Sequence, residues 1–230
     1  MPFPLTIAID GPAASGKSTL ADHLAADLKY LFFDTGVMYR ALTWAVIKNG
    51  ILTTDETAIT RLAQQIQIDV FPPSVADGRA SDVLVDGQDV TWEIRQPDVD
   101  GSVSVVAAYP GVRQAMSVLQ RRIGLRERVV MVGRDIGTVI LPEAEIKFYL
   151  DASVEERARR RTVELQARGE NISYEAILNS MRQRDKIDST RAVAPLYPAS
   201  DAIIINSDGL SMEQVLQKVK ELLDRQADHD

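Results

Sequence analysis

At 230 residues the chain is long for one compact domain and short for two, and its composition, 45% hydrophobic and 26% charged, is that of a globular protein. A formal net charge of −7 argues against general nucleic-acid binding, because such binding needs a basic face that displaces counterions. The chain has no cysteine and no apolar stretch of membrane-spanning length, so the sequence predicts a cytoplasmic protein without disulfides, thiolate metal sites or a membrane partner.

Short apolar runs alternate with amphipathic segments along most of the chain. The first run, residues 5–10, is rich in β-branched side chains and predicts a buried parallel strand. Leu20, Leu24 and Leu28 then recur at four-residue spacing, which indicates one face of a helix. This alternation predicts an α/β fold with a doubly wound, five-stranded parallel sheet covered by helices. Strands are expected at residues 5–10, 30–33, 129–132, 146–150 and 202–205, and helices at 18–28, 38–48, 154–167, 174–184 and 212–225.

One stretch, between residues 66 and 90, interrupts this rhythm. It contains the turn signals Asp77-Gly78 and Asp86-Gly87 among alternating apolar residues. The apolar residues on either side of the second turn predict a small antiparallel unit, followed by a helical stretch. We therefore expect a core made of residues 1–65 and 110–230, with a small α+β domain inserted at residues 66–109.

A glycine-rich segment follows the first predicted strand. It fits the pattern G-x-x-x-x-G-K-[ST] between a strand and a helix. Glycines let successive N–H groups point at one centre, and the helix N-terminus adds its dipole. Lys17 would reach the β- and γ-phosphates of a nucleotide, and the Ser18 hydroxyl would ligate Mg²⁺. The segment predicts binding of ATP or GTP phosphates by Gly11, Pro12, Ala13, Ala14, Ser15, Gly16, Lys17, Ser18 and Thr19.

This loop is shared by GTPases, motors, transport ATPases and kinases. A GTPase should carry an N-K-x-D motif that reads guanine, and the sequence contains none. A motor or transport ATPase usually places an acid at the end of an apolar strand within a larger chain, and no segment here is a persuasive candidate. These observations favour a phosphoryl transferase whose acceptor is held by its own set of cations.

Arginines gather where predicted strands and helices end. Arg40 and Arg134 each come shortly after a strand, at the edge where ligands bind in open sheets. Arg184, Asp188 and Arg191 have the spacing i, i+4 and i+7, which predicts one face of a helix. Each cluster is also compatible with an ordinary surface ion pair. Their number beside a phosphate loop favours an anionic acceptor.

A further arginine cluster lies at residues 157–161. In one interpretation these arginines pair with Glu155, Glu156 and Glu164 at helical spacing on a solvated face. In the other, the concentrated positive charge binds a small polyanionic ligand. The sequence leaves both interpretations open.

Taken together, these segments closely resemble bacterial cytidylate kinases, the CMP/dCMP kinases of the nucleoside monophosphate kinase group. The matching segments occur in family order from residue 5 to about 225. The phosphate loop is common to many families, whereas two later segments, with the insert around Asp86-Gly87, are specific to this one. The specific segments are residues 104–113 and 184–196, and the others are residues 10–19, 34–40, 85–91 and 133–138.

The resemblance implies a P-loop kinase that transfers the γ-phosphoryl group of ATP to CMP or dCMP with Mg²⁺, and that works as a monomer. It implies that the insert is an enlarged monophosphate-binding domain and that residues 154–169 form a short arginine-rich lid. Lys17, Arg157 and Arg161 would be catalytic. The implied acceptor residues are Arg40, Arg134 and Arg191 for the α-phosphate, Ser104, Arg113 and Asp135 for cytosine, Arg184 and Asp188 for the ribose, and Thr35.

Two departures and two alternatives accompany this resemblance. Val132 stands where the family often has an acid, and Val37 where alanine is common, but neither change removes a predicted ligand. The acceptor could instead be UMP, AMP or shikimate; uracil, however, would set an oxygen against Asp135, which a buried polar site rejects strongly. A nucleotide-sensing module that no longer catalyses would show a damaged loop or missing arginines, and all are present.

Overall fold

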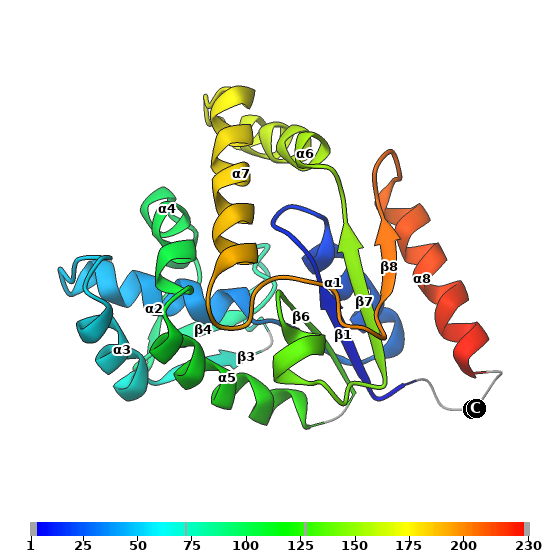
Figure 1. The fold of residues 1–230 in the computed structure, drawn as a ribbon, viewed down its shortest axis with the longest axis horizontal. Coiled ribbons are helices and arrows are strands. Elements are labelled where there is room, and N and C mark those ends of the chain that lie inside the picture. The colour runs from blue at the N-terminus through cyan, green and yellow to red at the C-terminus, as the bar shows by residue number, and fades with distance from the viewer. Residues whose placement is uncertain (1–3, 72, 127, 228–230) are drawn as a thin grey trace. The chain divides into compact units, whose positions relative to one another are not determined.

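The computed structural model describes residues 4–71, 73–126 and 128–227 (Figure 1). The chain divides into two compact units. The core unit comprises Met1–Asp34, Gly124–Thr190 and Ala194–Asp230, and the second unit comprises Thr35–Ile123 and Arg191–Val193. Among the described residues, no helix combines the length and the apolar character needed to cross a bilayer.

The core unit contains a five-stranded sheet whose strand order is β2-β6-β1-β7-β8. All neighbouring strands are parallel, as predicted. β6 is buried at every position, which explains its continuous apolar sequence. Each observed strand lies within one or two residues of its predicted position. The strands are β1 (Thr6–Asp10), β2 (Leu31–Asp34), β6 (Val129–Gly133), β7 (Ile146–Asp151) and β8 (Ile203–Asn206).

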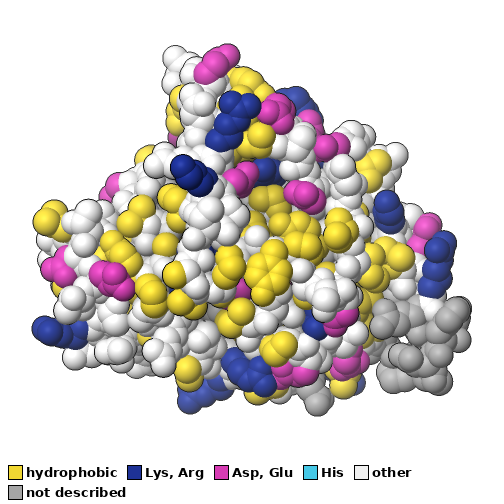
Figure 2. Space-filling view, viewed as in Figure 1, with side chains coloured by type: hydrophobic (Ala, Val, Ile, Leu, Met, Phe, Trp, Pro, Cys, Tyr) yellow, Lys and Arg dark blue, Asp and Glu magenta, His cyan; other side chains and the backbone are white. Residues whose placement is uncertain are grey.

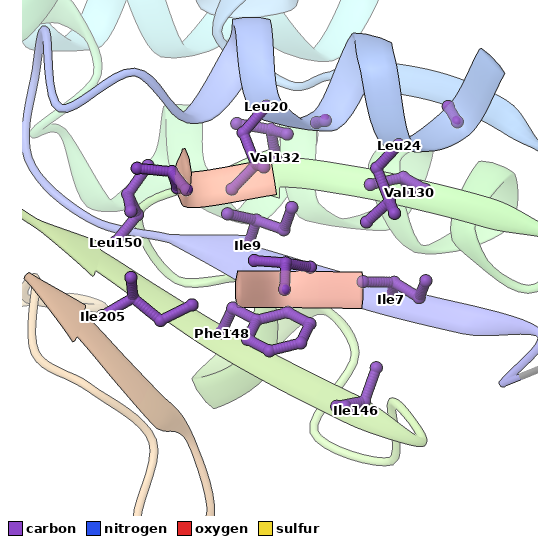
Figure 3. Packing of buried hydrophobic residues seen from close by; sticks show 14 of the residues in the cluster. Ile7, Ile9, Leu20, Leu24, Val130, Val132, Ile146, Phe148, Leu150 and Ile205 are labelled. Atoms are coloured by element: carbon purple, nitrogen blue, oxygen red, sulfur yellow. The ribbon is translucent and has the colours of Figure 1, made fainter. Parts of the chain in front are cut away.

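Helices pack against this sheet through the residues that periodicity predicted. In Figure 3, Leu20 and Leu24 point from α1 toward Val130 and Val132 of β6. Leu28 packs at the margin of the same cluster. The helical elements of the core unit are α1 (Lys17–Leu28), the π-helical turn η2 (Ile136–Ile140), α6 (Val154–Ala167), α7 (Tyr174–Thr190) and α8 (Met212–Ala227).

The second unit contains a three-stranded antiparallel sheet, in the order β3-β4-β5. The predicted turn joins β4 to β5, and Asp86 and Gly87 have φ angles of 49° and 80°, as a tight hairpin turn requires. The predicted insert, residues 66–109, lies wholly within this unit, and its domain boundaries stay a prediction. The elements are α2 (Gly36–Lys48), α3 (Glu56–Gln65), β3 (Ile68–Phe71), β4 (Asp82–Val85), β5 (Gln88–Asp89), η1 (Glu93–Arg95), α4 (Pro97–Val106) and α5 (Pro110–Gly124).

The expectation that Arg191 shares a helix face with Arg184 and Asp188 is wrong. Helix α7 ends at Thr190, and the N–H of Leu196 turns back to the Asp188 carbonyl at 2.8 Å. The chain leaves helical geometry beyond Thr190 because the Asp188 carbonyl accepts this returning N–H group, and Ala194 has a φ angle of 50°. The helical spacing therefore relates Arg184 to Asp188 alone.

Candidate active site

The loop that joins β1 to α1, residues 11–16, has the backbone shape that its sequence pattern predicts. Gly11, Ala14 and Gly16 have φ angles of 145°, 58° and 96°, a region that favours glycine. A side chain is excluded at Gly11, since a Cβ atom there would lie 2.1 Å from the carbonyl oxygen of Leu150. Gly16 is the N-cap of α1 and supplies no side-chain cap. The N–H groups of the first helical turn are therefore arranged as in other anion sites.

Lys17 lies inside this loop. Its side chain is buried, and Nζ donates hydrogen bonds to the Pro12 carbonyl at 2.6 Å and to the Ser15 hydroxyl at 3.4 Å. Burial, together with the positive charge of Arg134, lowers the pKa of Lys17 well below its usual value. Bound phosphates would reverse this shift, because an opposite charge favours the protonated amine.

Two arginines of α6 hold the phosphate loop through its carbonyl groups. Arg157 is buried, donates from Nη1 to the Ala13 carbonyl at 3.2 Å and forms an ion pair with Asp185 at 2.6 Å. Arg160 donates from Nη1 to the Ser15 carbonyl at 3.4 Å. Because these bonds engage carbonyl oxygens, the N–H groups of the loop are left for a ligand. The sequence analysis placed Arg160 in the arginine cluster without an individual role, although a spacing of three from Arg157 indicates a shared helix face.

The remaining arginines of residues 157–161 follow the ion-pair interpretation. Arg159 pairs with Glu156 at 2.7 Å, and Arg161 pairs with Glu164 at 2.9 Å. Basic and acidic side chains are accordingly mixed over α6 and α7 (Figure 2). The catalytic roles of the lid arginines stay predictions.

Asp10, the last residue of β1, is a site residue that the sequence interpretation did not assign. Asp10 is 4% exposed, and its carboxylate accepts hydrogen bonds from the N–H groups of Ile136 at 2.9 Å and Gly137 at 2.8 Å. Position 137 is closely packed, since a Cβ atom there would lie 3.0 Å from Cδ of Lys147 and 3.5 Å from Oδ2 of Asp10. Asp10 thereby fixes the backbone that follows the predicted acceptor residues Arg134 and Asp135.

We expect protein stability to depend on pH through Asp10. Burial raises the pKa of this carboxyl from 3.8 to about 6, so the folded state holds the proton more tightly than the unfolded state. The resulting stabilisation is complete below about pH 4 and is lost as the pH rises through about 6. Between about pH 5 and pH 7.5, urea denaturation should show that the unfolding free energy of the wild type, relative to Asp10→Asn, falls by about 1.4 kcal/mol. The same difference at both pH values would contradict this linkage.

In the core unit, the predicted acceptor residues come directly after β6 or lie on α7. Nε of Arg134 forms an ion pair with Oδ2 of Asp188 at 3.1 Å. Asp188 and Asp135 are buried, at 5% and 4% exposure, and Arg184 precedes Asp188 by one helical turn. The structure thus joins a residue predicted to bind phosphate to one predicted to bind ribose, a contact that spacing along the chain did not indicate.

In the second unit, two predicted acceptor arginines are held by local partners. Arg40 forms an ion pair with Asp100 and donates to the Ile94 carbonyl at 3.1 Å. Arg113 is buried and lies 5.4 Å from the ring centre of Tyr39. The sequence interpretation missed Asp100, because sixty residues separate it from Arg40. The other predicted acceptor residues in this unit are Thr35, Ser104 and Arg191.

A parallel sheet in this order, a glycine-shaped loop leading into the first helix and arginines at the strand ends define a P-loop phosphotransferase. The family follows from the sequence. A family model described as cytidylate kinase matches residues 7–225. The chain belongs to the cytidylate kinase family, and the resemblance drawn from its motifs is confirmed.

Curated relatives agree with this assignment, and a solved structure shares the fold. Proteins named cytidylate kinase from Roseiflexus castenholzii, Herpetosiphon aurantiacus and Bacillus velezensis are 55%, 51% and 46% identical to the chain. The alignments cover 95%, 97% and 97% of this chain and 93%, 96% and 98% of the relatives. In fold, the chain resembles a gluconokinase from Sinorhizobium meliloti 1021, with a TM-score of 0.50 and 14% identity over 100% of this chain and 97% of that one.

Proposed function

We propose that the protein transfers the γ-phosphoryl group of ATP to CMP or dCMP, which yields ADP and CDP or dCDP. The observation that carries the proposal is the parallel pairing of β1 and β6, with Asp10 opposite Gly133. The phosphate loop begins directly after Asp10, and Arg134 directly follows Gly133. A donor loop and an acceptor arginine therefore leave adjacent strands at the same edge of the sheet. The shared name of the relatives supports CMP as the acceptor.

Catalysis in this proposal comes from alignment and charge neutralisation. The acceptor phosphate is already ionised near neutral pH, so the protein needs no general base. Lys17 and arginines supply positive charge where negative charge spreads over the transferring group. Mg²⁺, when bound, neutralises charge on the ATP phosphates, and the Ser18 hydroxyl is an oxygen donor of the kind that this ion prefers.

Recognition of the acceptor is assigned to the residues that the resemblance implies. Cytosine offers an amino donor, which suits the carboxylate of Asp135 beside an arginine. The burial of Asp135 and Arg113, each 4% exposed, supports this assignment, because buried polar groups reject a mismatched base strongly. The ion pair of Arg134 with Asp188 supports a ribose subsite next to the phosphate subsite. The proposed set is Arg40, Arg134 and Arg191 for phosphate, Ser104, Arg113 and Asp135 for the base, Arg184 and Asp188 for the ribose, and Thr35.

Water must be kept from the phosphoryl group during transfer. We assign this role to the insert, residues 66–109, and to the lid, residues 154–169, closing over bound substrates. The net charge of −7 supports small-molecule substrates over nucleic acid. The monomeric state and the cytoplasmic location stay predictions.

The test is release of ADP from Mg·ATP, measured in a coupled assay with CMP, dCMP, UMP, AMP, GMP and shikimate as separate acceptors. We expect fast turnover with CMP and dCMP, and a loss of about a hundredfold or more in kcat/KM for CMP in Asp135→Ala. Turnover confined to another acceptor would retain the kinase and overturn the proposed pocket. ATP binding without turnover on any acceptor would favour a nucleotide-sensing protein.

A further inference from the structure

Asp34 ends β2 and contacts the residue that the phosphate loop offers to a metal ion. The Ser18 hydroxyl donates a hydrogen bond to Oδ2 of Asp34 at 2.5 Å. Ser18 is the second residue of α1, directly after Lys17. A short hydroxyl–carboxylate bond of this kind sets the direction of the oxygen lone pairs of the serine.

The strand register shows why a carboxylate at this place is informative. Asp34 of β2 lies opposite Val132 of β6 in parallel pairing, so both side chains project to the same face of the sheet. Figure 3 places the Val132 side chain below α1, the helix that carries Ser18. The end of β6 is thus apolar, and the adjacent strand supplies the carboxylate.

Other acids at the strand ends are engaged in backbone contacts. Asp10 is buried and accepts two backbone N–H groups. Asp151, at the end of β7, accepts the N–H of Ala152 at 2.9 Å. Asp34, in addition, contacts the side chain of a predicted metal ligand.

From this geometry we infer that Asp34 is the protein carboxylate of the Mg²⁺ site and acts together with Ser18. Mg²⁺ in phosphotransferases is held by one or two protein oxygens and the substrate phosphates, and it keeps several waters. Asp34 accepts the hydrogen bond that the Ser18 hydroxyl donates, so the oxygen lone pairs of the serine are available to the metal. The negative charge of Asp34 attracts the ion. Carboxylates that orient a metal ligand in this way change metal affinity by about tenfold to a hundredfold. The inference rests on the proposed function, because the metal there acts with ATP.

The test measures metal affinity without an acceptor. Mn²⁺ serves as the probe for the Mg²⁺ site, and electron paramagnetic resonance of free Mn²⁺ reports its binding to the protein–ADP complex. We expect Asp34→Asn to weaken Mn²⁺ binding about tenfold to a hundredfold, while affinity for ADP in EDTA changes less than about twofold. Asp27→Asn is the matched control, since Asp27 lies on α1 in an ion pair with Lys220; it should bind Mn²⁺ as the wild type does.

Ser18→Ala, which removes the other partner of the hydrogen bond, is a second variant for the case that Asp34→Asn folds poorly, and it also permits a double-mutant cycle. Because both residues serve one site, their combined loss should equal the larger single loss instead of the sum. Equal Mn²⁺ affinity in wild type and Asp34→Asn, strictly additive losses, or ADP binding that is weakened equally with and without metal would each overturn the inference. A wild type that shows these affinities yet fails to phosphorylate CMP would refute the proposed function alone.

Discussion

Lys17→Met should lower kcat for CMP phosphorylation by about a thousandfold or more. The ammonium is the positive charge that the loop directs to the ATP phosphates, and methionine keeps the length of the side chain without the charge. Stability should not fall, because burial disfavours the charged amine in the free protein, as its lowered pKa indicates. The measurements are coupled ADP release and the thermal midpoint of the same preparation.

Lys220→Met is the control for this substitution. Lys220 carries the same charge on α8 and pairs with Asp27 at 2.5 Å, with its side chain 41% exposed. It should retain full kcat, since exposed ion pairs contribute little. If Lys17→Met kept more than about a tenth of the wild-type kcat, the loop lysine would not be stabilising the transition state.

Gly11→Ala should disable the donor site through the backbone. The added Cβ would meet the carbonyl oxygen of Leu150 at 2.1 Å, and φ at this position is 145°. The loop or β7 must therefore shift, and we expect the unfolding free energy to fall by about 2–3 kcal/mol and ATP affinity to fall about tenfold or more. Urea denaturation and ATP titration would measure the two effects.

Gly101→Ala provides the comparison for this glycine. Gly101 lies within α4, and a Cβ atom there would meet nothing within 4 Å. Alanine should be neutral or stabilising by up to about 1 kcal/mol, because it restricts the unfolded chain in a helical position. Wild-type ATP affinity in Gly11→Ala would show that the close contact with Leu150 does not shape the loop.

The parallel strands were predictable because their sequence signal is local and their environment is uniform. Residues 129–133 are all buried, and an unbroken apolar run of this length predicts a buried parallel strand with few alternatives. The sequence did not predict helices α3 and α5, because the contacts that define them are not visible in the local sequence. Helix α5 begins with Pro110-Gly111, which is typical of a turn. Glycine fits there because a Cβ atom would lie 2.3 Å from the side chain of Thr60, a contact that no local pattern reveals.

The candidate site also has one part that the sequence predicts and one that it does not. The phosphate loop is contiguous, so its fold and chemistry can be predicted from one segment. The partners of its surrounding charges are distant in the sequence, such as Asp185 for Arg157 and Asp100 for Arg40. Spacing along the chain also gave a wrong expectation at Arg191, since helix α7 ends one residue before it. Residue types at the site were thus predictable, and their pairings depended on the fold.

The two arginine contacts from α6 limit where the proposed lid, residues 154–169, could bend. Arg157 and Arg160 tie the first two turns of α6 to the carbonyls of Ala13 and Ser15. While those bonds last, a hinge cannot lie at the start of the helix. The moving segment of the proposed lid would then lie beyond residue 160. Helix α6 ends at Ala167, and Gly169 follows with a φ angle of 80°. If residues 154–169 close as the proposed lid, the base of that lid and the donor loop should move as one body, and the phosphate-binding loop should keep its shape when the lid closes.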